Sequence, residues 1–275
     1  MIQYLYLGRV GYDDGLRLQA EIAELRSRGR IDNVLLLLEH PPVLTLGRNA
    51  HRTNVLATDE LLAQRGVTVH EINRGGDVTY HGPGQLVGYP IFDLRTLRNP
   101  NGDRPNSFRI GPVDFVRLME EALIRLCGSF GVHAGRVAGL TGVWCGESGP
   151  ERKIGAIGIH VARGITSHGF AFNVTTDLRD FALIVPCGIP DHAVTSLDLE
   201  VEHPEELPAL ETVAHQAARQ FGLVFDQQVQ AVESLAALRA QAAVAAPGFP
   251  AEDTPVQVPA EVERLIHKQG RPIQA

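Results

Sequence analysis

Residues 153–173 read KIGAIGIHVARGITSHGFAFN, and this stretch predicts a β-hairpin. Two strand-like runs, 154–162 and 165–173, flank the dipeptide Arg163-Gly164. Two such runs joined by a two-residue turn with glycine are typical of a β-hairpin. Small residues recur in both runs, and they leave room along a sheet face for a slender apolar ligand. These residues are Gly155, Ala156, Gly158, Gly169 and Ala171.

The rest of the chain adds strands and helices in an irregular order. The apolar run 34–38 predicts a buried strand, 43–47 looks like its return strand, and Pro90 predicts an edge or bulged strand. This mixture predicts an α+β (mixed α/β) fold, a single domain around a large mixed sheet flanked by helices. Other expected strands are 2–7, 67–72 and 86–94, and expected helices are 13–28, 113–130, 208–221 and 229–243, with a short helix from Thr58.

Composition excludes several classes of protein. A 275-residue chain that is 44% hydrophobic and 21% charged can bury a large core and is not disordered. A net charge of −7 argues against nucleic-acid binding. Three cysteines make no disulfide framework: Cys127 is expected in a helix core and Cys145 at a buried strand end. No apolar run approaches 18 residues and none follows a basic start, so we expect a soluble, cytoplasmic protein without a membrane segment.

Lys153 is conspicuous because the chain has two lysines against 23 arginines. Arginine keeps its proton in proteins, whereas a buried lysine can lose it and act as a base. Cys187 stands between Pro186 and Gly188 in a predicted loop, with no helix N-terminus following to stabilise a thiolate. A nearby base is then needed, and Lys153 is the natural candidate. These residues alone leave two readings open, a Cys–Lys acyl-transfer enzyme and a small-ligand binder.

A second glycine-rich segment runs from Arg74 to Gln85 and reads RGGDVTYHGPGQ. Four glycines and a proline in twelve residues predict a tight loop whose backbone approaches a ligand closely. Arg74 and His81 offer a cation and a titratable donor at its ends. A dinucleotide-binding loop is disfavoured because no helix follows. The alternative is a structural turn with a satisfied histidine.

Together these segments resemble the lipoyl(octanoyl) transferases, the octanoyl-acyl-carrier-protein:protein octanoyltransferases. The family fold is similar to the catalytic domains of biotin and lipoate protein ligases. Two departures are visible: the loop Asn99–Asn106 looks longer than usual, and the chain past about Phe225 has no family counterpart. We therefore expect a catalytic domain at 1–225, and at 226–275 a C-terminal helix and Pro/Ala-rich tail that is not an independent domain. The resemblance spans about residues 1–222 in consistent order, through segments 39–48, 74–85, 141–144, 153–158, 186–189 and 195–197.

The resemblance implies an acyltransferase that moves an octanoyl group from octanoyl-acyl carrier protein to a lysine of a lipoyl domain. The implied acceptors are the lipoyl domains of 2-oxoacid dehydrogenase E2 subunits and the glycine cleavage H protein. The family's catalytic pair falls on Cys187 and Lys153, and His81 is expected to orient groups near the thioester. Exchanging a thioester for an amide is downhill, so no ATP, other cofactor or metal is expected. The implied acyl-binding residues are Arg74, Gly75, Gly76, Asp77, Val78, Thr79, Tyr80, His81, Ala156, Ile157, Gly158, Gly169, Phe170 and Ala171.

Three alternatives remain on the sequence. An ATP-dependent lipoate or biotin protein ligase shares the scaffold and needs no cysteine nucleophile. A Cys–Lys thioesterase would release free octanoate without an acceptor protein. A non-enzymatic acyl or carrier-protein binding module would leave Cys187 unacylated. Acylation of Cys187 and the need for ATP separate these alternatives.

Overall fold

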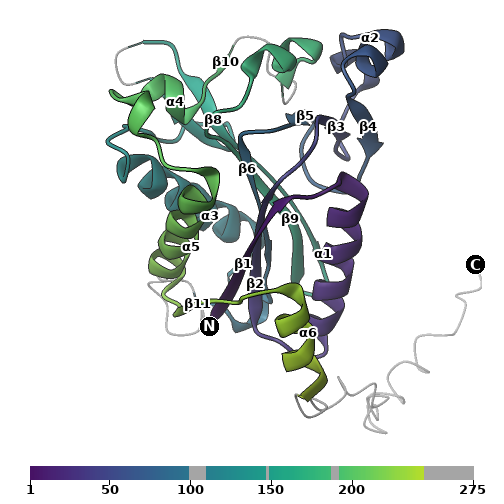
Figure 1. Cartoon of the computed structure of the whole chain (residues 1–275), viewed down its shortest axis with the longest axis vertical. Helices are drawn as coiled ribbons and strands as arrows, with labels where there is room; N and C mark the ends of the chain where they lie inside the picture. Colours follow the sequence, from purple (N-terminus) through teal and green to yellow (C-terminus); the bar gives the residue numbers. More distant parts are fainter. Residues whose placement is uncertain (99–109, 147–148, 187–191, 245–275) are drawn as a thin grey trace, which may run out of the picture.

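The computed structural model describes residues 1–98, 110–146, 149–186 and 192–244. The strands of its larger sheet are ordered β10-β8-β9-β6-β2-β1-β11, and β7 pairs with β8 on the edge opposite β10. Helices pack on both faces of this sheet, α3 and α5 on one and α1 and α6 on the other (Figure 1). The strand bounds are β1 Ile2–Arg9, β2 Asn33–Glu39, β6 Gln85–Ile91, β7 Val143–Cys145, β8 Arg152–Ala162, β9 Ile165–Asn173, β10 Ala193–Val194 and β11 Val229–Ala231. The helix bounds are α1 Tyr12–Ser27, α2 Asp59–Gln64, α3 Pro112–Gly128, α4 Leu197–Glu200, α5 Leu210–Phe225 and α6 Leu235–Val244.

Strand β2 shows why the sheet is covered on both faces. Successive side chains of a strand point to opposite faces, and every residue of 33–38 is buried. Leu35 and Leu37 join the hydrophobic cluster under α3 and α5, whereas Leu36 and Leu38 join the cluster under α1 and α6. A continuous apolar run therefore marks a central strand here. The predicted mixed α/β fold, with a large mixed sheet flanked by helices, is confirmed.

A smaller sheet, ordered β4-β3-β5, follows the carboxyl end of β2 and lies next to α2, at the upper right of Figure 1. Its strands are β3 Val43–Leu46, β4 Thr68–Glu71 and β5 Val78–His81. Its own hydrophobic cluster includes residues of the 3₁₀ helix η3, Leu178–Leu183. The segment 43–47 is thus a strand as predicted, but it does not return along β2. It pairs with β4 in parallel and with β5 in antiparallel orientation.

Pro90 does not mark an edge strand, because β6 lies between β2 and β9 and is buried throughout. The β6–β9 ladder stops at the pair Gly88 and Phe170 and resumes as the bridge between Asp93 and Ile165, so Pro90 lies in the gap between them. A Cβ on Gly169 would approach the Pro90 Cδ to 2.5 Å, so the proline ring fills the place where β9 carries no side chain. The proline lies where that ladder is interrupted, which is how a central strand tolerates it.

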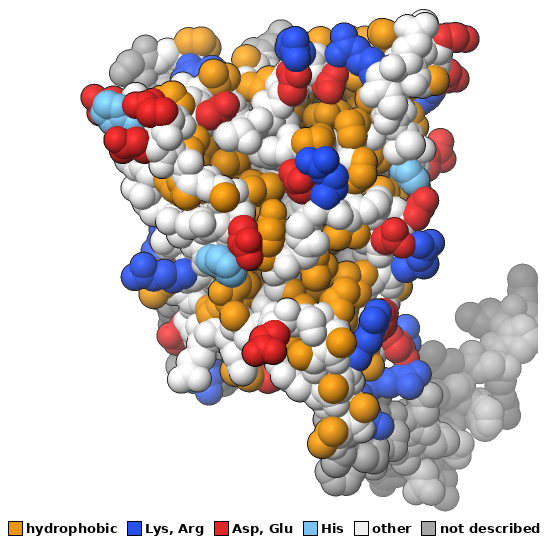
Figure 2. All heavy atoms as spheres, in the orientation of Figure 1, with side chains coloured by type: hydrophobic (Ala, Val, Ile, Leu, Met, Phe, Trp, Pro, Cys, Tyr) orange, Lys and Arg blue, Asp and Glu red, His pale blue; other side chains and the backbone are white. Residues whose placement is uncertain are grey.

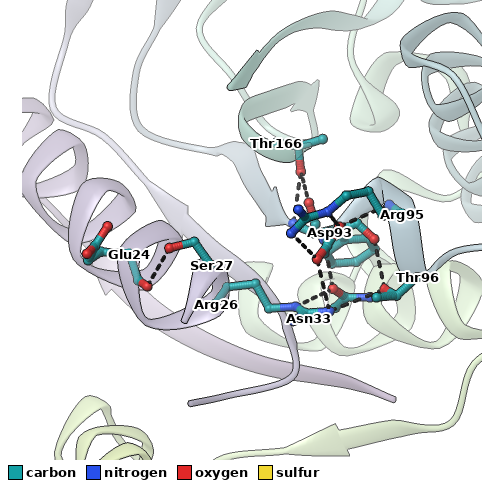
Figure 3. Close-up of polar contacts among 9 residues, drawn as sticks. Glu24, Arg26, Ser27, Asn33, Asp93, Arg95, Thr96 and Thr166 are labelled. Carbon is teal, nitrogen blue, oxygen red and sulfur yellow. Dashed lines mark hydrogen bonds and ion pairs between the residues drawn. The ribbon is translucent and has the colours of Figure 1, made fainter. Parts of the chain in front are cut away.

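The start of β2 and the end of β6 are joined by a polar network (Figure 3). Asn33 Oδ1 accepts hydrogen bonds from the Asp93 N–H and from Arg26 Nε, each at 2.9 Å. Arg95 donates two hydrogen bonds of 2.8 Å to the Asp93 carboxylate. Burial raises the pKa of Asp93, but the hydrogen bonds and charge of Arg95 lower it by more, so the net shift is downward. This network fixes the strand ends at the side of the sheet away from the small sheet.

The segment after Phe225 is packed on the domain as far as residue 244. The helix expected at 229–243 is wrong at its start, because Val229–Ala231 forms β11, which extends the sheet next to β1. The remaining helix α6 buries Leu238 against the α1 face of the sheet. Arg239 of α6 donates two hydrogen bonds to Glu21 of α1, at 2.6 and 2.7 Å. The independence of residues 226–275 stays a prediction, since residues 245–275 lie outside the described part.

The outer face combines charged and hydrophobic side chains. Figure 2 shows charged side chains of both signs around hydrophobic ones that run down the middle of this face and over α6. Among the described residues, no helix is both long enough and apolar enough to span a membrane. A cytoplasmic location stays a prediction.

Candidate active site

A cavity of about 190 Å³ lies between the small sheet and the β8–β9 hairpin. It is bounded on one side by residues 74–81, which we call the polar wall, and on the other by residues of β8 and β9 between 153 and 171, which we call the hairpin wall. Eleven of the fourteen residues that the family resemblance implies for acyl binding line this cavity, and so does Lys153. The full lining is Arg74, Gly76, Asp77, Thr79, His81, Thr141, Lys153, Ala156, Ile157, Gly158, His168, Gly169, Phe170 and Ala171.

Three of the implied residues lie elsewhere. Val78 and Tyr80 alternate with Thr79 and His81 along β5, so their side chains enter the hydrophobic cluster of the small sheet instead of the cavity. The Tyr80 hydroxyl donates a 2.9 Å hydrogen bond to Asp180. Gly75 lies behind the cavity, where its N–H donates a 2.9 Å hydrogen bond to the Ile159 carbonyl of β8.

The hairpin wall combines small residues with the larger side chains of Lys153, Ile157, His168 and Phe170. Ala156 faces Ala171 across the strands, and Gly158 faces Gly169. A Cβ on Gly158 would stand 2.6 Å from the Gly75 carbonyl oxygen, so glycine is needed there for the polar wall to dock on β8. A Cβ on Gly169 would stand 2.1 Å from the Gly88 carbonyl oxygen. Both glycines therefore serve backbone packing, and the alanines leave the space for a ligand.

Arg74 is buried at the back of the polar wall, with 8% of its surface exposed. Its Nη2 donates hydrogen bonds to the Thr45 carbonyl at 2.6 Å and to the Thr45 Oγ1 at 2.8 Å, and its Nη1 donates to the Gly75 carbonyl at 3.0 Å. The planar guanidinium thus joins β3 to the glycine-rich loop. Its positive charge also lines the cavity.

His81 is held as a neutral ring with a defined tautomer. The Gln85 amide donates to the Tyr80 carbonyl at 3.1 Å and to Asn173 Oδ1 at 2.9 Å, so its oxygen is the acceptor for His81 Nδ1 at 2.7 Å. The His81 Nε2 then carries the lone pair, 3.4 Å from the Thr45 hydroxyl. Burial, with a smaller contribution from the charge of His40, lowers the pKa of His81 to about 3. His81 can accept a hydrogen bond at the cavity but carries no charge at neutral pH.

Two cavity residues were missed in the sequence analysis, Thr141 and His168. His168 has a left-handed backbone, with φ +57°, in the middle of β9. Its N–H donates to Gln19 Oε1 at 2.7 Å, and its Nε2 lies 2.8 Å from Asn73 Oδ1. Burial, with a smaller contribution from the charge of Arg74, lowers the pKa of His168 to about 4. The one available signal was a glycine inside a strand pattern, which suggests an irregular strand.

Lys153 lies at the inner end of the cavity with 7% of its surface exposed. Its Nζ stands 4.6 Å from the centre of the Trp144 ring. Within the described ranges it forms no ion pair. A second, smaller cavity is lined by both Lys153 and Pro186. Further along the chain, Val194 pairs with Lys153 in the sheet, and the Thr195 N–H donates to the Lys153 carbonyl at 2.9 Å.

Cys187, the predicted nucleophile, lies outside the described residues, as does the loop Asn99–Asn106. The other two cysteines are buried as predicted, Cys127 in α3 and Cys145 at the end of β7. Burial raises the pKa of Cys145 to about 12 and that of Cys127 well above its ordinary value. Both thiols therefore stay protonated at neutral pH and make poor nucleophiles.

Comparisons with known proteins show the family of the chain and its fold. Residues 12–222 match the lipoyl protein ligase A/B catalytic domain. An octanoyltransferase of Acidobacterium capsulatum is 64% identical over 236 residues, which are 85% of this chain and 94% of that protein. A crystal structure of lipoate-protein ligase A bound with ATP superposes with a TM-score of 0.62 at 17% identity, over 88% of this chain and 93% of the other. A Thermoplasma acidophilum bi-partite lipoate protein ligase, described with its E2 lipoyl domain, gives 0.59 at 16% identity, over 88% and 91%. The chain belongs to the octanoyltransferase family, within the lipoyl protein ligase A/B catalytic domain.

Proposed function

We propose that this protein takes an octanoyl group from octanoyl-acyl carrier protein and passes it to a lysine of a lipoyl domain, through an acyl-cysteine at Cys187. Octanoyl transfer in protein lipoylation follows from membership of the octanoyltransferase family. The acyl carrier protein as donor, the lipoyl domains of E2 subunits and of the glycine cleavage H protein as acceptors, and the two catalytic residues are the proposal's own content.

The placement of Lys153 carries the proposal. Pro186, which precedes Cys187 in sequence, shares a cavity with Lys153, and Val194 pairs with Lys153 in the sheet. The described chain therefore lies beside Lys153 at residue 186 and again at residue 194. Cys127 and Cys145 are buried in the core and offer no competing nucleophile. The cavity between the two walls supports acyl binding because its hairpin wall includes apolar side chains and the small residues Ala156 and Ala171.

The chemistry follows in two balanced steps. Lys153 Nζ takes the Cys187 thiol proton, and the thiolate attacks the thioester carbonyl of the donor. The C–S bond to the carrier breaks, and the carrier thiol leaves with the proton returned by Lys153. The acceptor ε-amine then attacks the acyl-cysteine, loses a proton to Lys153 and forms the amide, while the Cys187 sulfur leaves and is reprotonated. No ATP enters either step, because a thioester is exchanged for an amide.

Intact mass spectrometry after mixing with octanoyl-acyl carrier protein tests the first step. We expect one added octanoyl group, which maps to the peptide containing Pro186 and Cys187. Cys187→Ser should remove this acyl-enzyme, and Cys145→Ser, at a buried thiol, should keep it. Acylation that persists in Cys187→Ser would rule out the nucleophile.

Addition of a lipoyl domain tests the second step and the sequence alternatives. We expect the octanoyl group to move from the enzyme to the lipoyl domain without ATP. Transfer that requires ATP would instead indicate a ligase, as for the lipoate-protein ligase A that shares the fold. Release of free octanoate with no acceptor present would indicate a thioesterase.

A further inference from the structure

The Trp144 ring lies under the Lys153 Nζ. In the β7–β8 register Trp144 is the partner of Lys153, and the Nζ lies 4.6 Å from the ring centre. Both side chains are buried, with 3% and 7% of their surfaces exposed. A cation over an indole face is attracted by the ring quadrupole, and the attraction grows when water is excluded.

The segment before Trp144 encloses the lysine stem. Gly142 has φ +125°, and a Cβ there would stand 3.3 Å from the Lys153 Cε and 2.5 Å from the Gly155 carbonyl oxygen. The Gly142 N–H donates a 3.0 Å hydrogen bond to Glu120, a fully buried carboxylate of α3. Arg136 donates to the same carboxylate at 3.0 Å. The enclosure of Lys153 is therefore anchored to the core.

The indole of Trp144 contacts Lys153 through its ring face, and its N–H forms no hydrogen bond among the described residues. The Trp144 Nε1 is buried and has no hydrogen-bond partner among the described residues. Burying an unpaired donor costs free energy that a phenyl or aliphatic side chain would not incur. On its other side the ring meets His192 edge-on, with centroids 5.1 Å apart. A tryptophan at this position is explained if its indole face positions the Lys153 Nζ.

We propose that Trp144 is a positioning residue for Lys153, whose indole face fixes the Nζ at the cavity and stabilises the ammonium that forms once Lys153 has taken a proton. This inference rests on the proposed function, in which Lys153 is the base. Trp144 itself does not line the described cavity, so it acts through Lys153 and not on the substrate.

Single-turnover acylation by octanoyl-acyl carrier protein, followed by intact mass, tests the proposal in the full-length protein. For Trp144→Leu we expect the rate constant at saturating donor to fall about tenfold to thirtyfold, with the half-saturating donor concentration within about twofold. For Trp144→Phe, which keeps an aromatic face, we expect a loss of less than about fivefold.

A matched control separates positioning from general destabilisation. Phe92 is another fully buried aromatic residue, whose ring contacts Phe115 and Phe225 away from the cavity. Phe92→Leu should lower the melting temperature but keep the acylation rate of the folded protein. A similar drop in rate for Phe92→Leu and Trp144→Leu would overturn the proposal, as would a Trp144→Leu enzyme at the wild-type rate.

Fluorescence gives a readout that does not depend on turnover. Trp144 is the single tryptophan of the chain, so its emission reports this ring alone. Lys153→Met removes the amino group over the ring, and we expect the native emission to change while the emission in denaturant does not. Unchanged native emission would overturn the proposal even if Trp144→Leu fails to fold. Failure of the wild type to acylate Cys187 would count against the proposed function and leave the fluorescence result to decide this inference.

Discussion

The two walls of the cavity are built by opposite means. The polar wall carries buried side chains that are hydrogen bonded to the backbone or to each other, such as Arg74 on Thr45 and His81 on Gln85. The hairpin wall carries little side-chain volume at Ala156 and Ala171, which face each other across it. A single change in the polar wall leaves buried partners unsatisfied, whereas a change in the hairpin wall adds volume. Polar-wall variants should therefore lose stability and activity together, and hairpin-wall variants should change which acyl group fits.

Lys153 is the exception to this contrast, and it provides the largest expected effect. It stands in the hairpin wall, yet it is expected to act by chemistry. Lys153→Arg keeps the charge but cannot give up its proton, so acylation of Cys187 should fall by about 10²–10⁴-fold. The measurement is the single-turnover rate by mass spectrometry.

The chain's other lysine gives the matched control, because Lys268→Arg makes the same chemical change elsewhere. This control should react at the wild-type rate. Near-normal transfer by Lys153→Arg would contradict the role of Lys153 as base.

Arg74→Lys should give the next largest effect, because it tests the polar wall. A lysine cannot reproduce the fork that joins the Thr45 carbonyl and hydroxyl to the Gly75 carbonyl. We expect the free energy of unfolding to fall by about 1–3 kcal/mol and kcat/KM for octanoyl-acyl carrier protein to fall about thirtyfold. Denaturant unfolding and steady-state kinetics measure the two losses.

Arg48→Lys is the control for that change, because Arg48 is exposed and contributes only its backbone N–H to the Arg74 carbonyl. It should leave both quantities nearly unchanged. An Arg74→Lys enzyme that loses activity with no loss of stability would show that the two properties of the polar wall are separable.

How much of this was predictable from the sequence differs between the walls. The hairpin around Arg163-Gly164 was predicted because a two-residue turn and two strand patterns are local signals. The polar wall was predicted only as a loop near a ligand. The side-chain contacts of Arg74 and His81 depend on Thr45 and Gln85, which tertiary packing brings to them.

The errors have the same origin. Strand 43–47 was identified correctly but assigned to the wrong partner, because pairing is decided by the whole sheet and not by the strand. Tyr80 was assigned to the acyl site together with its neighbours. Because side chains alternate along a strand, its hydroxyl instead lies outside the cavity, where it donates to Asp180. His168 was missed because a left-handed backbone at a histidine leaves little trace in sequence. Local sequence patterns thus predicted the helices and strands. Long-range packing, which these patterns do not contain, determines which side chains reach the cavity.

Ala171→Val tests the hairpin wall with a smaller expected effect. Added methyl groups narrow the cavity opposite Ala156 without removing a hydrogen bond. We expect kcat/KM for octanoyl-acyl carrier protein to fall about tenfold and that for a butyryl donor to fall less, since the shorter chain needs less room. Ala162→Val, at an exposed position of the same hairpin, should change neither value. Equal losses for both donors would show that Ala171 does not set the acyl length.

The buried histidines are expected to have the smallest effect at neutral pH. Their contribution to folding stability appears on acidification. Burial lowers the pKa of His40 to about 4, that of His81 to about 3 and that of His168 to about 4, against 6.5 for an ordinary histidine. Below about pH 6.5 these histidines therefore bind protons in the unfolded chain but remain neutral in the folded chain. Stability from these residues is complete above pH 6.5 and is lost as the pH falls from there toward 4, by at most about 1.4 kcal/mol per histidine per pH unit.

His168→Asn sharpens this last test, because asparagine tolerates the left-handed backbone and carries no titrating group. Urea unfolding between pH 7 and 4.5 should give a shallower loss of stability for this variant than for the wild type, by up to about 1.4 kcal/mol per pH unit. His51→Asn, at an exposed histidine, should follow the wild-type curve. Parallel curves for His168→Asn and the wild type would mean that folding does not lower the pKa of His168. The cavity would then gain a second positive charge beside Arg74 as the pH falls below about 6.5.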